Sequence, residues 1–90
     1  MVRHKVVLYN PTAVFFDMPL SLLAIGSALD PERIEVQIID ARVDPNAQNT
    51  LEEACKTALC LGITSLTGSP TQDALNTTRR IRAKYATLPI

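Results

Sequence analysis

Small hydroxyl side chains gather directly after an apolar run in the second half of the chain. Residues 59–66 read LCLGITSL, and Thr64, Ser65 and Thr67 stand just before Gly68. In open α/β sheets, ligands bind at the carboxyl ends of the strands. Hydroxyls can pair with polar atoms of a ligand, and a glycine lets the ligand come close to the backbone. The pattern therefore predicts a ligand site after this strand.

A second unusual loop follows the first apolar run of the chain. Residues 10–19 read NPTAVFFDMP, which is apolar and contains two prolines and no glycine. Such a loop cannot present a nest of backbone N–H groups to a phosphate. It predicts an apolar shelf at the ligand-facing rim, or alternatively aromatic side chains that cap the core or face a neighbouring domain.

Several familiar chemistries are excluded or disfavoured by residue types and spacing. The chain has three glycines, so neither G-x-G-x-x-G nor the Walker P-loop can be written. Asp40 ends the second apolar run, where a ribose-binding acid would stand, but a loop carboxylate or cap is the favoured interpretation. A phosphorylatable receiver would need an aspartate after the third strand, where Thr64 and Ser65 stand instead. Cys55 and Cys60 have neither redox nor zinc spacing, and both are predicted to be buried free thiols.

Composition places further bounds on function. Ninety residues make one small domain, and nine basic residues balance nine acidic ones. This balance argues against nucleic acid or an anionic membrane as the partner. No apolar run approaches the ~18 residues of a membrane span, and the start of the sequence leads straight into a strand-like run rather than a signal peptide. A cytoplasmic protein is the default expectation.

The predicted elements alternate between strand and helix. Two short strands are expected at residues 5–9 and 34–39, the second of them alternating apolar and polar as an edge strand does. Between them, Pro19 opens a largely buried helix that ends before Asp30-Pro31.

The second half of the chain continues this alternation. After a polar loop, a capping box of Thr50 and Glu53 predicts a helix to about Leu59, followed by a third strand at residues 61–66. Ser69 and Gln72 form another capping box, which opens a helix to about Thr87. That helix is expected to carry three residues toward the core: Leu75, Ile81 and Tyr85.

This order predicts a parallel sheet with right-handed crossovers. The fold class is a Rossmann-like or flavodoxin-like three-layer α/β/α domain with strand order 2-1-3-4. Residues 88–90 look like the entry to a fourth strand that is cut off. Residues 1–90 are therefore expected to be the N-terminal portion of a longer protein.

The sequence resembles the N-terminal cobalamin-binding domain of B12-dependent radical SAM enzymes. The resemblance rests on Asn10-Pro11 after the first strand, residues 19–24 (PLSLLA), residues 36–40 (VQIID) and residues 61–67 (LGITSLT). It covers nearly the whole chain in the expected order.

The resemblance implies a site for cobalamin. In this family the corrin ring lies over the carboxyl ends of the strands, and its nucleotide tail enters a groove beside the third strand. Small side chains and hydroxyls would give the tail room and polar partners. The cofactor-binding residues that the resemblance implies come from the two loops: Asn10, Pro11, Thr12, Phe16, Thr64, Ser65, Thr67 and Gly68.

The sequence departs from cobalamin domains that ligate cobalt through histidine. In the motif D-x-H-x-x-G the histidine binds the metal, but Asp17 is followed here by Met18-Pro19-Leu20. The single histidine, His4, precedes the first strand and is expected at the opposite end of the sheet. The cobalt of a bound cobalamin is therefore expected to have no histidine ligand on the lower face of the corrin ring. The lack of this ligand would change the coordination and redox behaviour of cobalt.

Catalysis is expected to need a downstream domain of the same chain. The radical SAM motif C-x-x-x-C-x-x-C is absent from these residues, so the 4Fe-4S cluster and S-adenosylmethionine are expected only beyond Ile90. The parent enzyme is expected to be a radical SAM enzyme, for example a methyltransferase, while residues 1–90 alone are expected to be inactive. Two alternatives stay open, namely an interaction module with no cofactor and a flavodoxin-like domain that binds a flavin or nucleotide.

Overall fold

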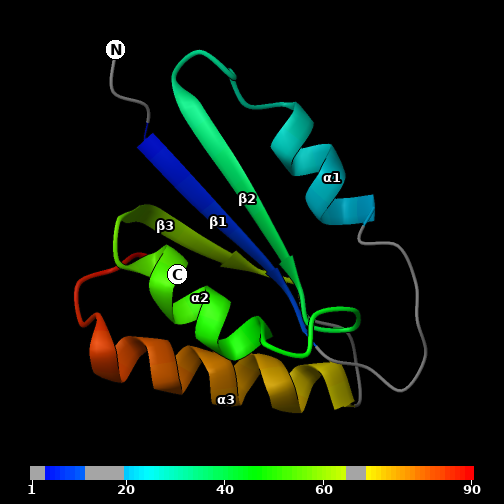
Figure 1. The fold of residues 1–90 in the computed structure, drawn as a ribbon, viewed down its shortest axis with the longest axis vertical. Helices are drawn as coiled ribbons and strands as arrows, with labels where there is room; N and C mark the ends of the chain where they lie inside the picture. The colour runs from blue at the N-terminus through cyan, green and yellow to red at the C-terminus, as the bar shows by residue number, and fades with distance from the viewer. Residues whose placement is uncertain (1–3, 12–19, 65–68) are drawn as a thin grey trace.

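The computed structural model describes residues 4–11, 20–64 and 69–90. Strands and helices alternate along them, as the sequence predicted (Figure 1). The elements are β1 (His4–Asn10), α1 (Leu20–Ser27), β2 (Ile34–Asp40), α2 (Ala47–Cys55), β3 (Ala58–Ile63) and α3 (Ser69–Lys84).

The three strands form one parallel sheet in the order β2-β1-β3. This confirms the predicted order of the first three strands, with β1 in the centre and β2 at an edge. The register joins Asn10 to Asp40 on one side of β1 and Tyr9 to Ile63 on the other. Since the strands are parallel, their carboxyl ends lie at one edge of the sheet.

The side chains of β1 alternate between two packed layers. Val6 and Leu8 contact Leu22 of α1 on one face, whereas Val7 and Tyr9 belong to the cluster beneath α2 and α3 on the other. Figure 1 shows α1 on one side of the sheet and both other helices on the opposite side. Alternate residues of a strand point to opposite faces, so this central strand is buried by both layers.

The start of α2 differs from the prediction. A helix from Thr50 was expected, but α2 begins at Ala47, and the backbone N–H of Thr50 already donates to the carbonyl of Asn46 at 3.0 Å. The turn before the helix is set by Asp44, whose Oδ1 accepts the backbone N–H of Asn46 at 2.9 Å. Because this turn ends the loop three residues early, the Thr50 and Glu53 pattern falls inside the helix and caps nothing.

The third strand also begins earlier than predicted. It runs over Ala58–Ile63 instead of residues 61–66, because α2 ends at Cys55 and the chain turns at once into the ladder with β1. Cys60 therefore lies within the strand and is half-buried rather than buried, while Cys55 is buried as expected. Both cysteines are free, as predicted.

Two helices bury less apolar surface than expected. In α1, Leu22 is buried, but Leu23 and Ile25 are 44% and 52% exposed. In α3, which ends at Lys84 rather than near Thr87, Ile81 is fully buried and Leu75 is 49% exposed. Within the described residues, no strand lies beyond β3 to cover Leu75.

A close approach explains one glycine of β3. A Cβ added at Gly62 would lie 2.8 Å from Cδ2 of Leu8, which is a buried side chain of the α1 layer.

No helix among the described residues has the length and apolar character that crossing a membrane requires.

Candidate functional site

The carboxyl edge of the sheet brings together three polar residues that the sequence singled out. Asn10 ends β1, Asp40 ends β2, and Thr64 follows β3, with its backbone N–H donating to the carbonyl of Tyr9 at 3.3 Å. Asn10 is 2% exposed, and Thr64 is half-buried. Pro11 is fully buried next to Asn10. The other predicted site residues lie outside the described residues: Thr12, Phe16, Ser65, Thr67 and Gly68.

Asn10 and Asp40 tie the ends of two strands together. Asn10 Nδ2 donates to Asp40 Oδ1 at 3.0 Å, and the same oxygen accepts the backbone N–H of Arg42 at 3.0 Å. The backbone N–H of Ala41 returns to the carbonyl of Asn10 at 2.9 Å. These contacts make Asp40 a turn-capping carboxylate, as the favoured interpretation of the sequence held.

A groove lies beside β3, on the side of α3. Its volume is about 300 Å³, and Thr71, Ala74 and Thr78 of α3 provide small side chains along it. Its apolar lining is Ile63, Leu75 and Ile90. The Thr78 hydroxyl donates to the carbonyl of Ala74 at 2.7 Å, so its proton is used within α3. The groove suits an uncharged group better than an anion, because no Lys, Arg or His is among its lining residues as described.

A polar network that the sequence did not predict sits between the end of β1 and the two helices. Tyr9 is fully buried, and its hydroxyl donates to Asp73 Oδ2 at 2.8 Å. Gln48 Nε2 donates to the Tyr9 hydroxyl at 2.7 Å and to Thr77 Oγ1 at 3.1 Å. Burial, together with the Asp73 carboxylate, raises the pKa of Tyr9 to about 12.

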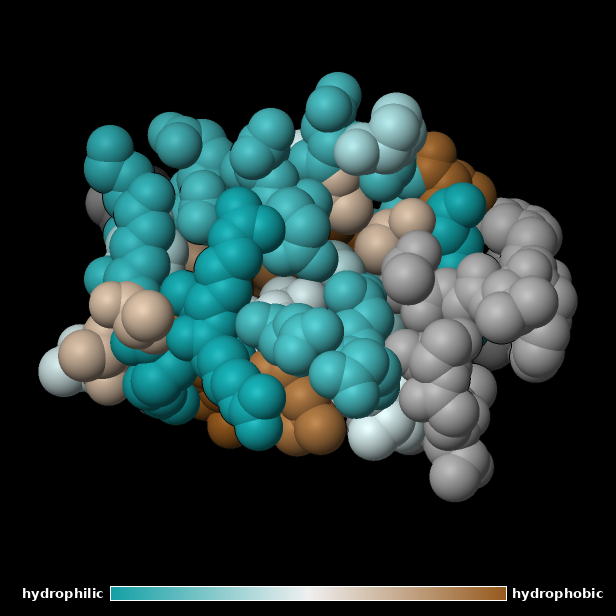
Figure 2. Space-filling view, turned by 90° about the horizontal axis from the view of Figure 1, so that it is seen from below, coloured by the Kyte–Doolittle hydropathy of each residue, from teal (hydrophilic) through white to brown (hydrophobic). Residues whose placement is uncertain are grey.

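The network extends to the outer surface of the helix pair. Arg80 Nη1 donates to Gln48 Oε1 at 2.8 Å, and its Nη2 lies 2.9 Å from Glu52 Oε1. The surface on the α3 side is largely hydrophilic (Figure 2). The basic residues of α3 are therefore solvent-facing residues, and Arg80 joins α3 to α2.

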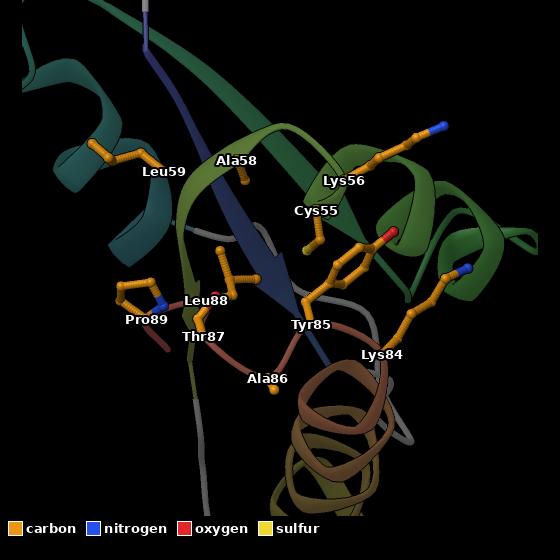
Figure 3. A pocket seen from close by; sticks show the side chains of 10 residues that line it. All are labelled: Cys55, Lys56, Ala58, Leu59, Lys84, Tyr85, Ala86, Thr87, Leu88 and Pro89. Carbon is orange, nitrogen blue, oxygen red and sulfur yellow. The ribbon is translucent and has the colours of Figure 1, made fainter.

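A different cavity, of about 460 Å³, opens at the amino end of β3. Figure 3 shows Cys55 and Tyr85 lining it on the α2 side, with the amines of Lys56 and Lys84 directed outward. Burial raises the pKa of the Cys55 thiol, which disfavours the reactive thiolate. This cavity lies at the end of the sheet where no ligand was expected.

The described residues near the strand ends do not gather as a metal centre would. His4 is exposed at the amino end of β1, as predicted, and thus at the opposite end from Asn10. Across the part of the chain that the structure describes, no three His, Cys, Asp or Glu side chains gather as metal ligands would.

Comparisons with known proteins add no relative. No family model, no curated protein and no solved structure matches this chain.

Proposed function

We propose that this chain is a cobalamin-binding domain of a B12-dependent radical SAM enzyme. The observation that carries the proposal is the groove of about 300 Å³ beside β3, lined by threonine and alanine of α3. The family resemblance implies that a nucleotide tail enters beside the third strand, and a groove of this lining is compatible with the uncharged base end of such a tail.

The arrangement of the strand ends supports the same proposal. The parallel order β2-β1-β3 brings Asn10, Pro11 and Thr64 to one edge, where ligands of open α/β sheets bind. When bound, cobalamin would supply a cobalt centre able to carry a methyl group. The chain's own residues would hold the corrin without a histidine ligand, since His4 lies at the far end of β1.

A fourth strand on the outer edge of β3 is part of the proposal. The backbone N–H of Leu61 donates to the carbonyl of Pro89 at 2.9 Å, so Pro89 makes one backbone hydrogen bond to this edge. An additional parallel strand there would extend the order to 2-1-3-4. Such a sheet would be flavodoxin-like, and a downstream domain would supply the iron–sulfur cluster and S-adenosylmethionine.

Titration with hydroxocobalamin tests the proposal, with the visible spectrum as the readout. We expect saturable binding that Thr64→Leu weakens at least tenfold, because a larger side chain would fill space at the end of β3. Thr57→Leu is the matched control, since Thr57 is exposed in the turn before β3 at the other end of the sheet. Binding should also survive His4→Ala.

Absence of cobalamin binding would contradict the proposal. Binding of a flavin instead would favour the flavodoxin-like alternative. If neither ligand binds to protein whose circular dichroism shows a folded α/β domain, the chain is an interaction module.

A further inference from the structure

A separate cavity lies at the carboxyl end of β1, on the side of α2 and α3. Its volume is about 330 Å³, and its lining residues come from the end of β1, the β2–α2 turn, the start of α2 and the first turns of α3. The residues that line it are Tyr9, Ala41, Asp44, Pro45, Ala47, Gln48 and Asp73.

The side-chain donors in this lining are already committed to the protein. The Tyr9 hydroxyl gives its one proton to Asp73 Oδ2. The Gln48 amide group has two N–H bonds, and it donates to the Tyr9 oxygen and to Thr77 Oγ1. Neither side chain therefore has a proton left to offer to a guest.

The loop backbone likewise offers few donors. The N–H groups of Ala41, Asp44 and Ala47 donate to the carbonyls of Asn10, Asp40 and Asp44, respectively. Pro45 has no N–H group at all. The described lining contains no Lys, Arg or His.

Carboxylate oxygen is therefore the dominant chemistry that this cavity presents. Asp44 and Asp73 both line it, and an ionised carboxylate accepts hydrogen bonds but donates none. An anionic guest would meet like charge there, and a guest that only accepts hydrogen bonds would find no donor. Asp44 Oδ1 accepts the backbone N–H of Asn46, and Asp73 Oδ2 accepts the Tyr9 hydroxyl. A carboxylate can accept several hydrogen bonds, so the cavity favours a small guest that donates them.

We propose that this cavity receives one primary-amide side arm of the bound corrin. The inference rests on the proposed function, because the corrin ring over the strand ends would bring its peripheral acetamide and propionamide arms beside β1. An amide N–H donating to Asp44 or Asp73 forms a hydrogen bond to a charged acceptor, the stronger kind of protein hydrogen bond. Such a hydrogen bond would help to orient a bound corrin ring relative to β1.

Cobalamin monocarboxylic acids provide the test, since each has one peripheral amide replaced by a carboxylate. Affinities of the protein for cobalamin and for each acid are compared at pH 8 by spectral titration. We expect one acid to bind at least tenfold more weakly than cobalamin, the order expected when a hydrogen bond to a charged group is lost. The remaining acids should bind as cobalamin does.

Asp44→Asn and Asp73→Asn identify the cavity as the origin of the effect. Each change keeps the side-chain shape and one acceptor oxygen, and adds N–H donors that suit a carboxylate guest. We expect at least one of them to reduce the tenfold difference toward unity. Asp30→Asn is the control, because Asp30 is exposed in the turn before β2 at the opposite end of the sheet.

The outcomes separate this inference from the function on which it rests. Equal binding of cobalamin and all the acids would overturn the amide assignment and leave the cobalamin proposal standing. A weakly binding acid whose deficit is unchanged in both Asn variants would also overturn it. No binding of cobalamin itself would remove both proposals together.

Discussion

Tyr9→Phe should destabilise the folded domain by removing one buried hydroxyl. The Tyr9 oxygen makes two hydrogen bonds, one to the Asp73 carboxylate at 2.8 Å and one from the Gln48 amide at 2.7 Å. Phenylalanine fills the same space, so no cavity term arises. The change isolates the polar contribution of this side chain.

The expected loss is about 2 kcal/mol of unfolding free energy. A hydrogen bond to a charged group contributes about 1.5–3 kcal/mol. The Gln48 amide still donates to Thr77 Oγ1, and Asp73 is only half-buried and can gain water, which holds the loss toward the lower part of that range. For a domain of this size the corresponding fall in Tm is about 10 °C.

The loss should also depend on pH. The pKa of Tyr9 is raised to about 12 from an ordinary value of 10.0, so the unfolded chain releases this proton at lower pH than the folded protein does. The contribution of Tyr9 to the free energy of unfolding is therefore fully present below about pH 10, and it declines as the pH rises from about 10 to 12. Phe lacks the proton, so the stability difference between the wild type and Tyr9→Phe should narrow across this window.

Urea unfolding followed by far-ultraviolet circular dichroism measures both effects. Tyr85→Phe is the matched control, because the Tyr85 hydroxyl donates to the neutral carbonyl of Glu52 at 2.9 Å. The control should lose about 0.5–1.5 kcal/mol and keep the wild-type decline above pH 10. Equal losses for both variants, with no narrowing for Tyr9→Phe, would refute the reasoning.

Two further predictions concern packing and thiol exposure. Gly62→Ala should cost about 1–3 kcal/mol in urea unfolding, because its Cβ would lie 2.8 Å from the buried Leu8 side chain. Gly26→Ala, whose Cβ would lie 3.2 Å from a Val36 methyl, should be near neutral, since alanine favours the helix. A loss for Gly62→Ala no larger than for Gly26→Ala would contradict this. Iodoacetamide should label Cys60 before Cys55 in folded protein by mass spectrometry, and labelling at equal rates would show that Cys55 is not shielded as described.

The sheet could be predicted because its signals are local. The continuous apolar run of β1 indicates a strand that is buried on both faces. The alternation of β2 indicates a strand that is buried on one face, and the two patterns together place β1 between its neighbours. The capping pair Thr50 and Glu53 predicted the wrong start for α2, because a turn set by Asp44 begins the helix three residues earlier. A local motif cannot show that another turn has already begun the helix.

The network and the exposed faces could not be predicted for a different reason. Tyr9 and Asp73 are 64 positions apart, and Gln48 is 39 positions from Tyr9, so no spacing rule links them. In α1, apolar residues surround the whole helix, so the sequence does not say that Leu22 faces the sheet while Leu23 does not.

The two tyrosines also give the domain an intrinsic optical probe. The chain has no tryptophan, and its only tyrosines are Tyr9 and Tyr85. The Tyr9 hydroxyl donates to Asp73 near the beginning of α3. Tyr85 follows α3, and its hydroxyl donates to the backbone carbonyl of Glu52 in α2. The near-ultraviolet circular dichroism of the two tyrosines should consequently be lost when α3 detaches from the sheet. The far-ultraviolet signal of the remaining helices should persist.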